Sequence, residues 1–202
     1  MKINFLHIEA FEKERSNPKV LLKFLLLFLL SCITAFISIS LTDYTSILKD
    51  LDLASTDIDS ALTLFKILGI IMSIIIYIFI FLMYFVITLI IAKVANLNVE
   101  VKSILAATLL MLIILSLIQI VILSIQWIFG LQLPDINIGS LNVLSPGQPI
   151  LGAINIQNIV TSWLFGVVLY STCHLSKKWA WIFAMIHLLF TILIGVIGFL
   201  VA

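Results

Sequence analysis

The sequence has few charged residues, and their placement excludes several classes of protein. Only 10% of the 202 residues are Asp, Glu, Lys or Arg, whereas ordinary soluble domains carry about 25%. Apart from Lys23, none of these charges lies inside five long apolar stretches, at residues 21–40, 67–92, 103–130, 154–172 and 179–201. Pumps and ion-coupled transporters need ionisable groups within the membrane, although each costs at least about 2.5 kcal/mol there. The shortage argues against a soluble domain and against a self-sufficient pump or secondary transporter.

Cysteine, histidine and catalytic motifs are also scarce. The two cysteines, Cys32 and Cys173, are too few for a disulfide framework and are expected where no oxidising compartment reaches both. The only histidines are His7, His174 and His187. The sequence contains no His-Glu-x-x-His, no Gly-x-Ser nucleophile motif with a later His in another span, no Walker loop and no dinucleotide fingerprint. We therefore expect no enzyme, no metal site and no cofactor.

Apolar residues dominate what is present. They make up 63% of the chain, and the mean hydropathy is +1.29. About 20 helical residues suffice to cross a hydrocarbon layer of about 30 Å. The sequence thus predicts an all-α fold, a polytopic bundle of five transmembrane helices over residues 18–202. An amphipathic arm, residues 1–17, precedes it, with Phe5, Ile8 and Phe11 on its apolar side, and is suited to lying on the inner membrane face.

The basic residues are sorted between alternate connections. Nine of the eleven lie in the N-terminal arm, at the start of the first stretch, and in the connections 93–102 and 173–178: Lys2, Lys13, Arg15, Lys19, Lys23, Lys93, Lys102, Lys177 and Lys178. The other two connections set Lys49 and Lys66 against Asp43, Asp50, Asp52, Asp57, Asp59 and Asp135. Basic residues in short loops stay cytoplasmic. This predicts a cytoplasmic N-terminus and an extracytoplasmic C-terminus.

Polar residues inside the spans are the candidate site residues. Gln119 and Gln126 are seven residues apart and so project from one helix face. Ser162 and His187 lie in the last two spans. We interpret all four as hydrogen-bonding contacts between helices. For His187 we prefer this role to that of a metal ligand, because no second ligand accompanies it.

Small residues predict how the last two spans pack. Ser162 and Gly166 are four residues apart, as are Ala180 and Ala184. Such pairs let helices approach closely. The connection 173–178 is so short that these two spans must be antiparallel neighbours.

The order of features also carries a resemblance. An arm with Phe11 leads through Asn17-Pro18 to the first span. Met83-Tyr84-Phe85, Ala92-Lys93 and Val101-Lys102-Ser103-Ile104-Leu105 follow in the middle, and Trp163, Gly166 and Ser176-Lys177-Lys178 precede the final span. This layout resembles the Yip family, the Ypt/Rab-interacting membrane proteins, in its bacterial branch. The Asp-Leu-Tyr-Gly-Pro signature of eukaryotic members is missing.

The resemblance implies a non-enzymatic accessory protein of a bacterial cell membrane, acting beside a transport complex such as an ABC exporter, in some cases in resistance to toxin peptides. Its partners would be the lipid bilayer and a membrane-protein complex, not nucleic acid. Two alternatives remain open. One is the solute-binding membrane subunit of an energy-coupling-factor importer, with the connection 131–152 as a lid over a pocket. The other is a bacteriocin immunity protein.

Overall fold

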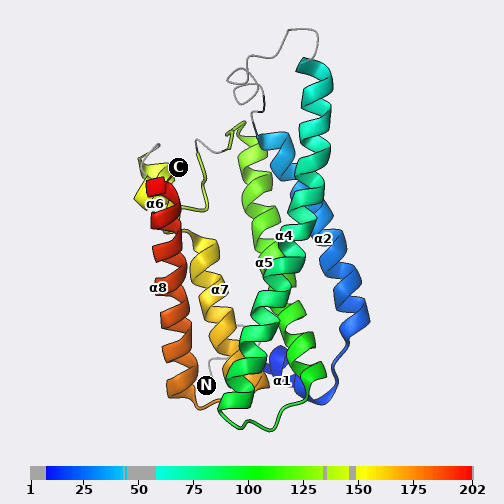
Figure 1. Ribbon diagram of the computed structural model, residues 1–202, viewed down its shortest axis with the longest axis vertical. Coiled ribbons are helices and arrows are strands. Elements are labelled where there is room, and N and C mark those ends of the chain that lie inside the picture. Colours follow the sequence, from blue (N-terminus) through cyan, green and yellow to red (C-terminus); the bar gives the residue numbers. More distant parts are fainter. Residues whose placement is uncertain (1–7, 43, 45–57, 134–135, 146–148, 202) are drawn as a thin grey trace.

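The computed structural model describes residues 8–42, 44, 58–133, 136–145 and 149–201, and every regular element among them is helical (Figure 1). In chain order the elements are α1 (Ile8–Ser16), α2 (Val20–Leu41), α4 (Ile58–Val94), α5 (Val101–Ile128), the 3₁₀ turn η1 (Leu141–Leu144), α6 (Pro149–Ala153), α7 (Ile156–Val167), the π-helical segment η2 (Val168–Thr172) and α8 (Lys177–Val201). The predicted all-α bundle is confirmed.

Four of the helices are long and apolar enough to cross a membrane: α2, Ser60–Val94 of α4, α5, and Lys177–Gly198 of α8. They correspond to four of the five predicted spans. The remaining stretch, predicted over 154–172, forms α7 and then η2, which together run from Ile156 to Thr172. Several residues of the charge argument lie outside the described residues: Lys2, Lys49, Asp43, Asp50, Asp52, Asp57 and Asp135. His7, one of the three histidines, lies outside them as well.

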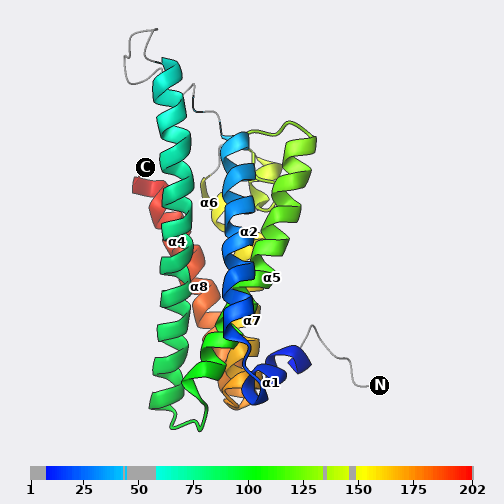
Figure 2. The same cartoon turned by 90° about the vertical axis from the view of Figure 1, so that its right-hand side faces the viewer.

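Helix α4 is longer than the predicted span. It begins at Ile58 rather than at residue 67. Its 37 residues correspond to about 55 Å at about 1.5 Å per residue, and it extends past the end of α2 in Figure 2. The helix ends in a Schellman turn at Asn96, whose φ is 51°, with Leu97 N–H donating to Ala92 O at 2.9 Å. Asn tolerates this left-handed conformation better than most residues.

Helix α5 is the centre of the bundle. In the most apolar 18-residue segment of α5, 44% of the residues are buried, whereas the corresponding share is 11% in α4 and in α8. Its buried side chains include Ile104, Leu109, Met111 and Leu123. The outer faces of α4 and α8 remain exposed and apolar, as helix faces in contact with lipid tails would be.

The short helix α1 packs across one end of the bundle (Figure 2). Phe11 is fully buried, so the apolar side of the arm, for which the sequence predicts a membrane surface, is turned toward protein. The Arg15 guanidinium donates to Thr172 O at 3.2 Å and to Asn98 O at 2.7 Å. Glu14 forms an ion pair with Lys23 at 2.7 Å. These contacts tie α1 to α2, to η2 and to the connection after α4.

Candidate functional site

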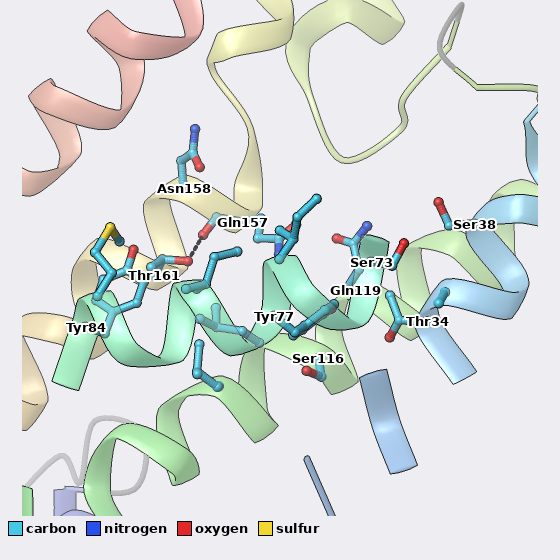
Figure 3. A pocket seen from close by; sticks show the side chains of 16 residues that line it. Thr34, Ser38, Ser73, Tyr77, Tyr84, Ser116, Gln119, Gln157, Asn158 and Thr161 are labelled. Carbon is cyan, nitrogen blue, oxygen red and sulfur yellow. Dashed lines mark hydrogen bonds between the residues drawn. The ribbon is translucent and has the colours of Figure 1, made fainter. Parts of the chain in front are cut away.

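A cavity of about 350 Å³ lies between α2, α4, α5 and α7 (Figure 3). Ten of its lining residues are polar: Thr34, Ser38, Ser73, Tyr77, Tyr84, Ser116, Gln119, Gln157, Asn158 and Thr161. Ala35, Ile76, Ile80, Met83, Leu112 and Leu115 complete the lining, so among the described residues no Asp, Glu, Lys or Arg lines it. A site of this kind suits an uncharged molecule with several hydrogen-bonding groups.

Helical spacing brings these polar groups to one place. Thr34 and Ser38 are four residues apart on α2, and Ser116 and Gln119 are three apart on α5. Residues three or four apart share a helix face. Ser73 and Tyr77, four residues apart, likewise share a face of α4. Each of the four helices that line the cavity therefore presents polar side chains to it.

Three of the seven hydroxyl groups in the lining donate to their own helix. Thr34 Oγ1 donates to Leu30 O at 2.9 Å, Ser73 Oγ to Gly69 O at 2.8 Å, and Thr161 Oγ1 to Gln157 O at 2.6 Å. The last of these bonds is drawn in Figure 3. Each of these oxygens keeps lone pairs with which it can accept a bond from a ligand.

Ser116 is different. Its side chain is buried, with 1% of its surface exposed, and its Oγ has no hydrogen-bond partner within the described part of the chain. Leaving a buried hydroxyl unpaired costs about 1–3 kcal/mol. Ser116 is part of the cavity wall, so the cavity is the space nearest to this unpaired hydroxyl from which a partner could come. Gln119, one turn along α5, likewise makes no hydrogen bond with the described residues and lines the same space.

A chain of hydrogen bonds leads from the cavity wall to α8. Tyr84 Oη lies 2.8 Å from His187 Nε2, and Ser162 Oγ lies 2.7 Å from His187 Nδ1. Ser162 Oγ is also 2.8 Å from Asn158 O. The Phe165 ring covers the imidazole, with ring centroids 5.4 Å apart. His187 thus joins α4, α7 and α8 through side-chain contacts.

Two arrangements of protons satisfy this chain when His187 is neutral. In the first, Tyr84 O–H donates to Nε2, Nδ1–H donates to Ser162 Oγ, and Ser162 O–H donates to Asn158 O. In the second, Ser162 donates to Nδ1 and Nε2–H donates to Tyr84, whose O–H is then free for another acceptor. The Tyr84 phenol is therefore a donor to His187 in one arrangement and an acceptor from it in the other.

The predicted polar residues lie in three places. Gln119 lines the cavity, whereas Gln126 is fully buried and donates from Nε2 to Ile136 O at 2.9 Å, in the connection after α5. Ser162 and His187, predicted separately, contact each other. Sequence reasoning missed Tyr84 and Ser116. The seven-residue spacing of Tyr77 and Tyr84 was the available signal for a polar face on α4.

The small residues predicted for helix packing lie at the contact between α7 and α8. A Cβ atom added to Gly166 would lie 2.9 Å from Ala184 Cβ and 3.4 Å from Ala180 O. A second close contact was not predicted: a Cβ on Gly195 would lie 2.8 Å from Ala153 Cβ of α6. The Gly166 contact holds α7 against α8, where Ser162 meets His187, and the Gly195 contact holds α6 against α8.

Cys32 and Cys173 are free thiols. Within the described ranges, no three His, Cys, Asp or Glu side chains gather as metal ligands would. No family model, curated protein or solved structure matches the chain.

Proposed function

We propose that this protein is a multi-pass membrane protein that binds a small uncharged molecule in the cavity between α2, α4, α5 and α7. The observation that carries the proposal is Ser116, a buried residue whose hydroxyl has no partner among the described residues, in the wall of a cavity that ten polar and uncharged side chains line. This favours the solute-binding class among the alternatives from the sequence. Binding of this kind requires neither a charged relay nor a metal.

The proposal includes five membrane crossings. Helix α7 and segment η2 continue one another over 17 residues, from Ile156 to Thr172, about 25 Å of helix. They pack against α8 along the Gly166 contact. A fifth crossing at this position would place the two chain ends on opposite sides of the bilayer.

The proposed orientation puts α1 in the cytoplasm of a bacterial cell. The connection from α4 to α5, that from α7 to α8, and α1 lie at one end of the bundle in Figure 1. That end holds most of the described basic residues: Lys13, Arg15, Lys19, Lys23, Lys93, Lys102, Lys177 and Lys178. Basic residues of short loops favour the cytoplasmic side. The cavity then lies toward the extracytoplasmic side, since Ser38 is near the end of α2 and Gln157 near the start of α7.

The family and partner predictions are compatible with this function but rest on other grounds. Membership of the Yip family, and a role beside an ABC exporter or in toxin-peptide resistance, stay predictions from the layout of the sequence. A ligand-binding accessory protein would combine the two lines of argument. We propose the role as non-enzymatic, and Ser162 fits it, because Ser162 is buried and committed to His187 and Asn158.

Co-purification tests the proposed function. The protein, extracted in mild detergent, is expected to release a small uncharged molecule that mass spectrometry detects after organic extraction. Ser116→Ala and Gln119→Leu should each reduce its yield at least fivefold, since both remove a cavity group without adding volume.

Ser171→Ala is the matched control for Ser116→Ala. Ser171 is equally buried, but its Oγ donates to Val167 O at 2.7 Å and it does not line the cavity. It should retain the molecule in full. Equal yields from the wild type and both cavity variants would overturn the proposal.

A further inference from the structure

We infer that the ligand is a single-chain amphiphile, whose uncharged, hydroxyl-bearing head occupies the polar cavity and whose hydrocarbon chain lies in an apolar groove between α2 and α4. The inference rests on the proposed function and specifies its ligand. The groove is a separate observation, with a volume of about 280 Å³. Its lining consists of Phe24, Leu27, Phe28 and Ser31 on α2 and Ile74, Tyr77, Ile78, Phe81 and Leu82 on α4.

The groove offers almost nothing to a polar ligand. Seven of its nine lining residues are aliphatic or phenylalanine side chains. The Ser31 hydroxyl donates to Phe28 O at 2.8 Å, so its proton is already used within α2. A hydrocarbon chain that enters from the lipid loses no solvation in this groove and gains packing contacts with its walls, whereas a polar group would lose its hydration here.

Cavity and groove are neighbours along α2 and share Tyr77 in their linings. Leu27, Ser31, Thr34 and Ser38 recur at intervals of four, three and four residues, and therefore form one stripe on the helix. The stripe faces the groove at Leu27 and Ser31 and the cavity at Thr34 and Ser38. Tyr77 of α4 lines both spaces. A molecule that fills both must be apolar at one end and polar at the other.

The dimensions favour one extended chain. From Phe24 to Ser31 and from Ser31 to Ser38 the helix rises about 10 Å each. A small solute would occupy the cavity alone and leave the groove unused. A phospholipid headgroup carries a phosphate, for which the cavity has no basic side chain among its lining residues.

The proposed orientation fixes where the head and the chain would lie. The head would lie in the extracytoplasmic half of the bilayer, and the chain would run from the middle, near Ser31, into the cytoplasmic half, since Phe24 is the fifth residue of α2. Phe24 and Phe28 are half exposed at the rim of the groove, so a chain can slide in from the surrounding lipid.

Binding of radiolabelled monoolein to the full-length protein, immobilised in detergent, tests the inference. Monoolein has one chain and an uncharged diol head. We expect saturable binding, which Ile78→Trp weakens at least tenfold by filling the groove. Ile75→Trp is the matched control: Ile75 is 51% exposed and Ile78 50%, but Ile75 lines neither space. It should bind as the wild type does.

Two further probes examine the head and the chain. Oleoyl lysophosphatidate, with the same chain and a charged head, should compete at least tenfold less well than unlabelled monoolein. A monoolein analogue with a diazirine at the chain end should crosslink to the peptide that contains Phe24 and Phe28, and this crosslink should disappear in Ile78→Trp. Competition by lysophosphatidate as strong as that by monoolein would overturn the uncharged head.

The outcomes separate this inference from the proposed function. If Ser116→Ala weakens monoolein binding while Ile78→Trp does not, the cavity binds the head and the groove assignment is wrong. If monoolein shows no saturable binding but Ser116→Ala still loses the co-purified molecule, the amphiphile is overturned and the cavity stands as a ligand site. If the co-purified molecule is also retained in Ser116→Ala, both proposals fail.

Discussion

Tyr84 and His187, 103 residues apart in the sequence, lie 2.8 Å apart between the phenolic oxygen and Nε2, and this bond links α4 to α8. The two rings also pack, with centroids 5.4 Å apart. Because Tyr84 lines the cavity and His187 continues to Ser162, the bond connects the wall of the site with the last two helices. Both residues thus contribute to the assembly of the bundle and to the polarity of the cavity.

Replacing Tyr84 with Phe should destabilise the bundle by about 1 kcal/mol. The change keeps the ring but leaves His187 Nε2 without its partner, and bonds between membrane helices contribute about 0.5–2 kcal/mol. The thermal midpoint in detergent, followed by size-exclusion chromatography, measures the loss. Tyr170→Phe, at a 40% exposed site, should leave the midpoint unchanged. An equal shift in both variants would contradict the structural role of the bond.

The effects of Tyr84→Phe and His187→Leu should not add. Either change alone breaks the same hydrogen bond and strands one polar partner, so the double variant should lose about 1 kcal/mol less than the two single losses combined. Chemical unfolding of the three variants beside the wild type gives the coupling. Strict additivity would mean that the two side chains do not interact in the folded protein.

The sequence predicted the helices well and the site only in part. Long apolar stretches can hardly form anything but membrane helices, so α2, α5 and α8 were expected within a few residues. Ser162, Gly166, Ala180 and Ala184 were assigned to packing because small residues at four-residue spacing have few other uses in a membrane helix. Each of these signals is local in sequence.

The rest depended on contacts between distant segments. Nothing near Tyr84 indicates that its partner is His187, and a serine such as Ser116 in an apolar helix is usually bonded to its own backbone. Only the way in which α5 packs against α2 and α4 shows that Ser116 is in the wall of a cavity and that its hydroxyl has no partner among the described residues. For the same reason the sequence did not predict that Phe11 packs against protein, since an amphipathic face fits a membrane surface equally well.

Gly166→Ala should separate α7 from α8. The added methyl group would lie 2.9 Å from Ala184 Cβ, inside the contact distance of two carbon atoms, and overpacking of this kind costs about 1–3 kcal/mol. Gly198→Ala is the matched control on α8, because a Cβ there meets no described atom within 4 Å. It should be neutral or stabilising by up to about 1 kcal/mol, as Ala is the better helix former. A Gly166→Ala protein as stable as wild type would contradict the close approach.

Glu14→Gln should loosen α1. Glu14 and Lys23 pair at 2.7 Å, and their side chains are only 10% and 13% exposed. An ion pair at this depth should contribute more to stability than an exposed surface pair and less than a fully buried one. Its loss should therefore cost about 1–2 kcal/mol. Hydrogen exchange of the α1 amides should become faster. Glu12→Gln, at an exposed site on the same helix, should leave the exchange unchanged. Equal rates in the two variants would contradict a role for the ion pair.

The thiol of Cys173 should react slowly in the folded protein and lower its stability at alkaline pH. Burial raises the pKa of Cys173 to about 12, and the nearby Arg15 guanidinium opposes part of this rise. In a Cys32→Ser background, maleimide at about pH 8 should label Cys173 only after unfolding in SDS, because the thiolate is the reactive form.

Above the ordinary thiol pKa of about 8.5 the unfolded chain loses the Cys173 proton while the folded protein keeps it. The free energy of unfolding should therefore fall as the pH rises from about 8.5 toward 12, and be unaffected by this group below that window. Comparing Cys173→Ala with its parent isolates the contribution from lysine and tyrosine titration. Rapid labelling in mild detergent, or an alkaline loss of stability that Cys173→Ala does not reduce, would show that this thiol is not buried as the structure has it.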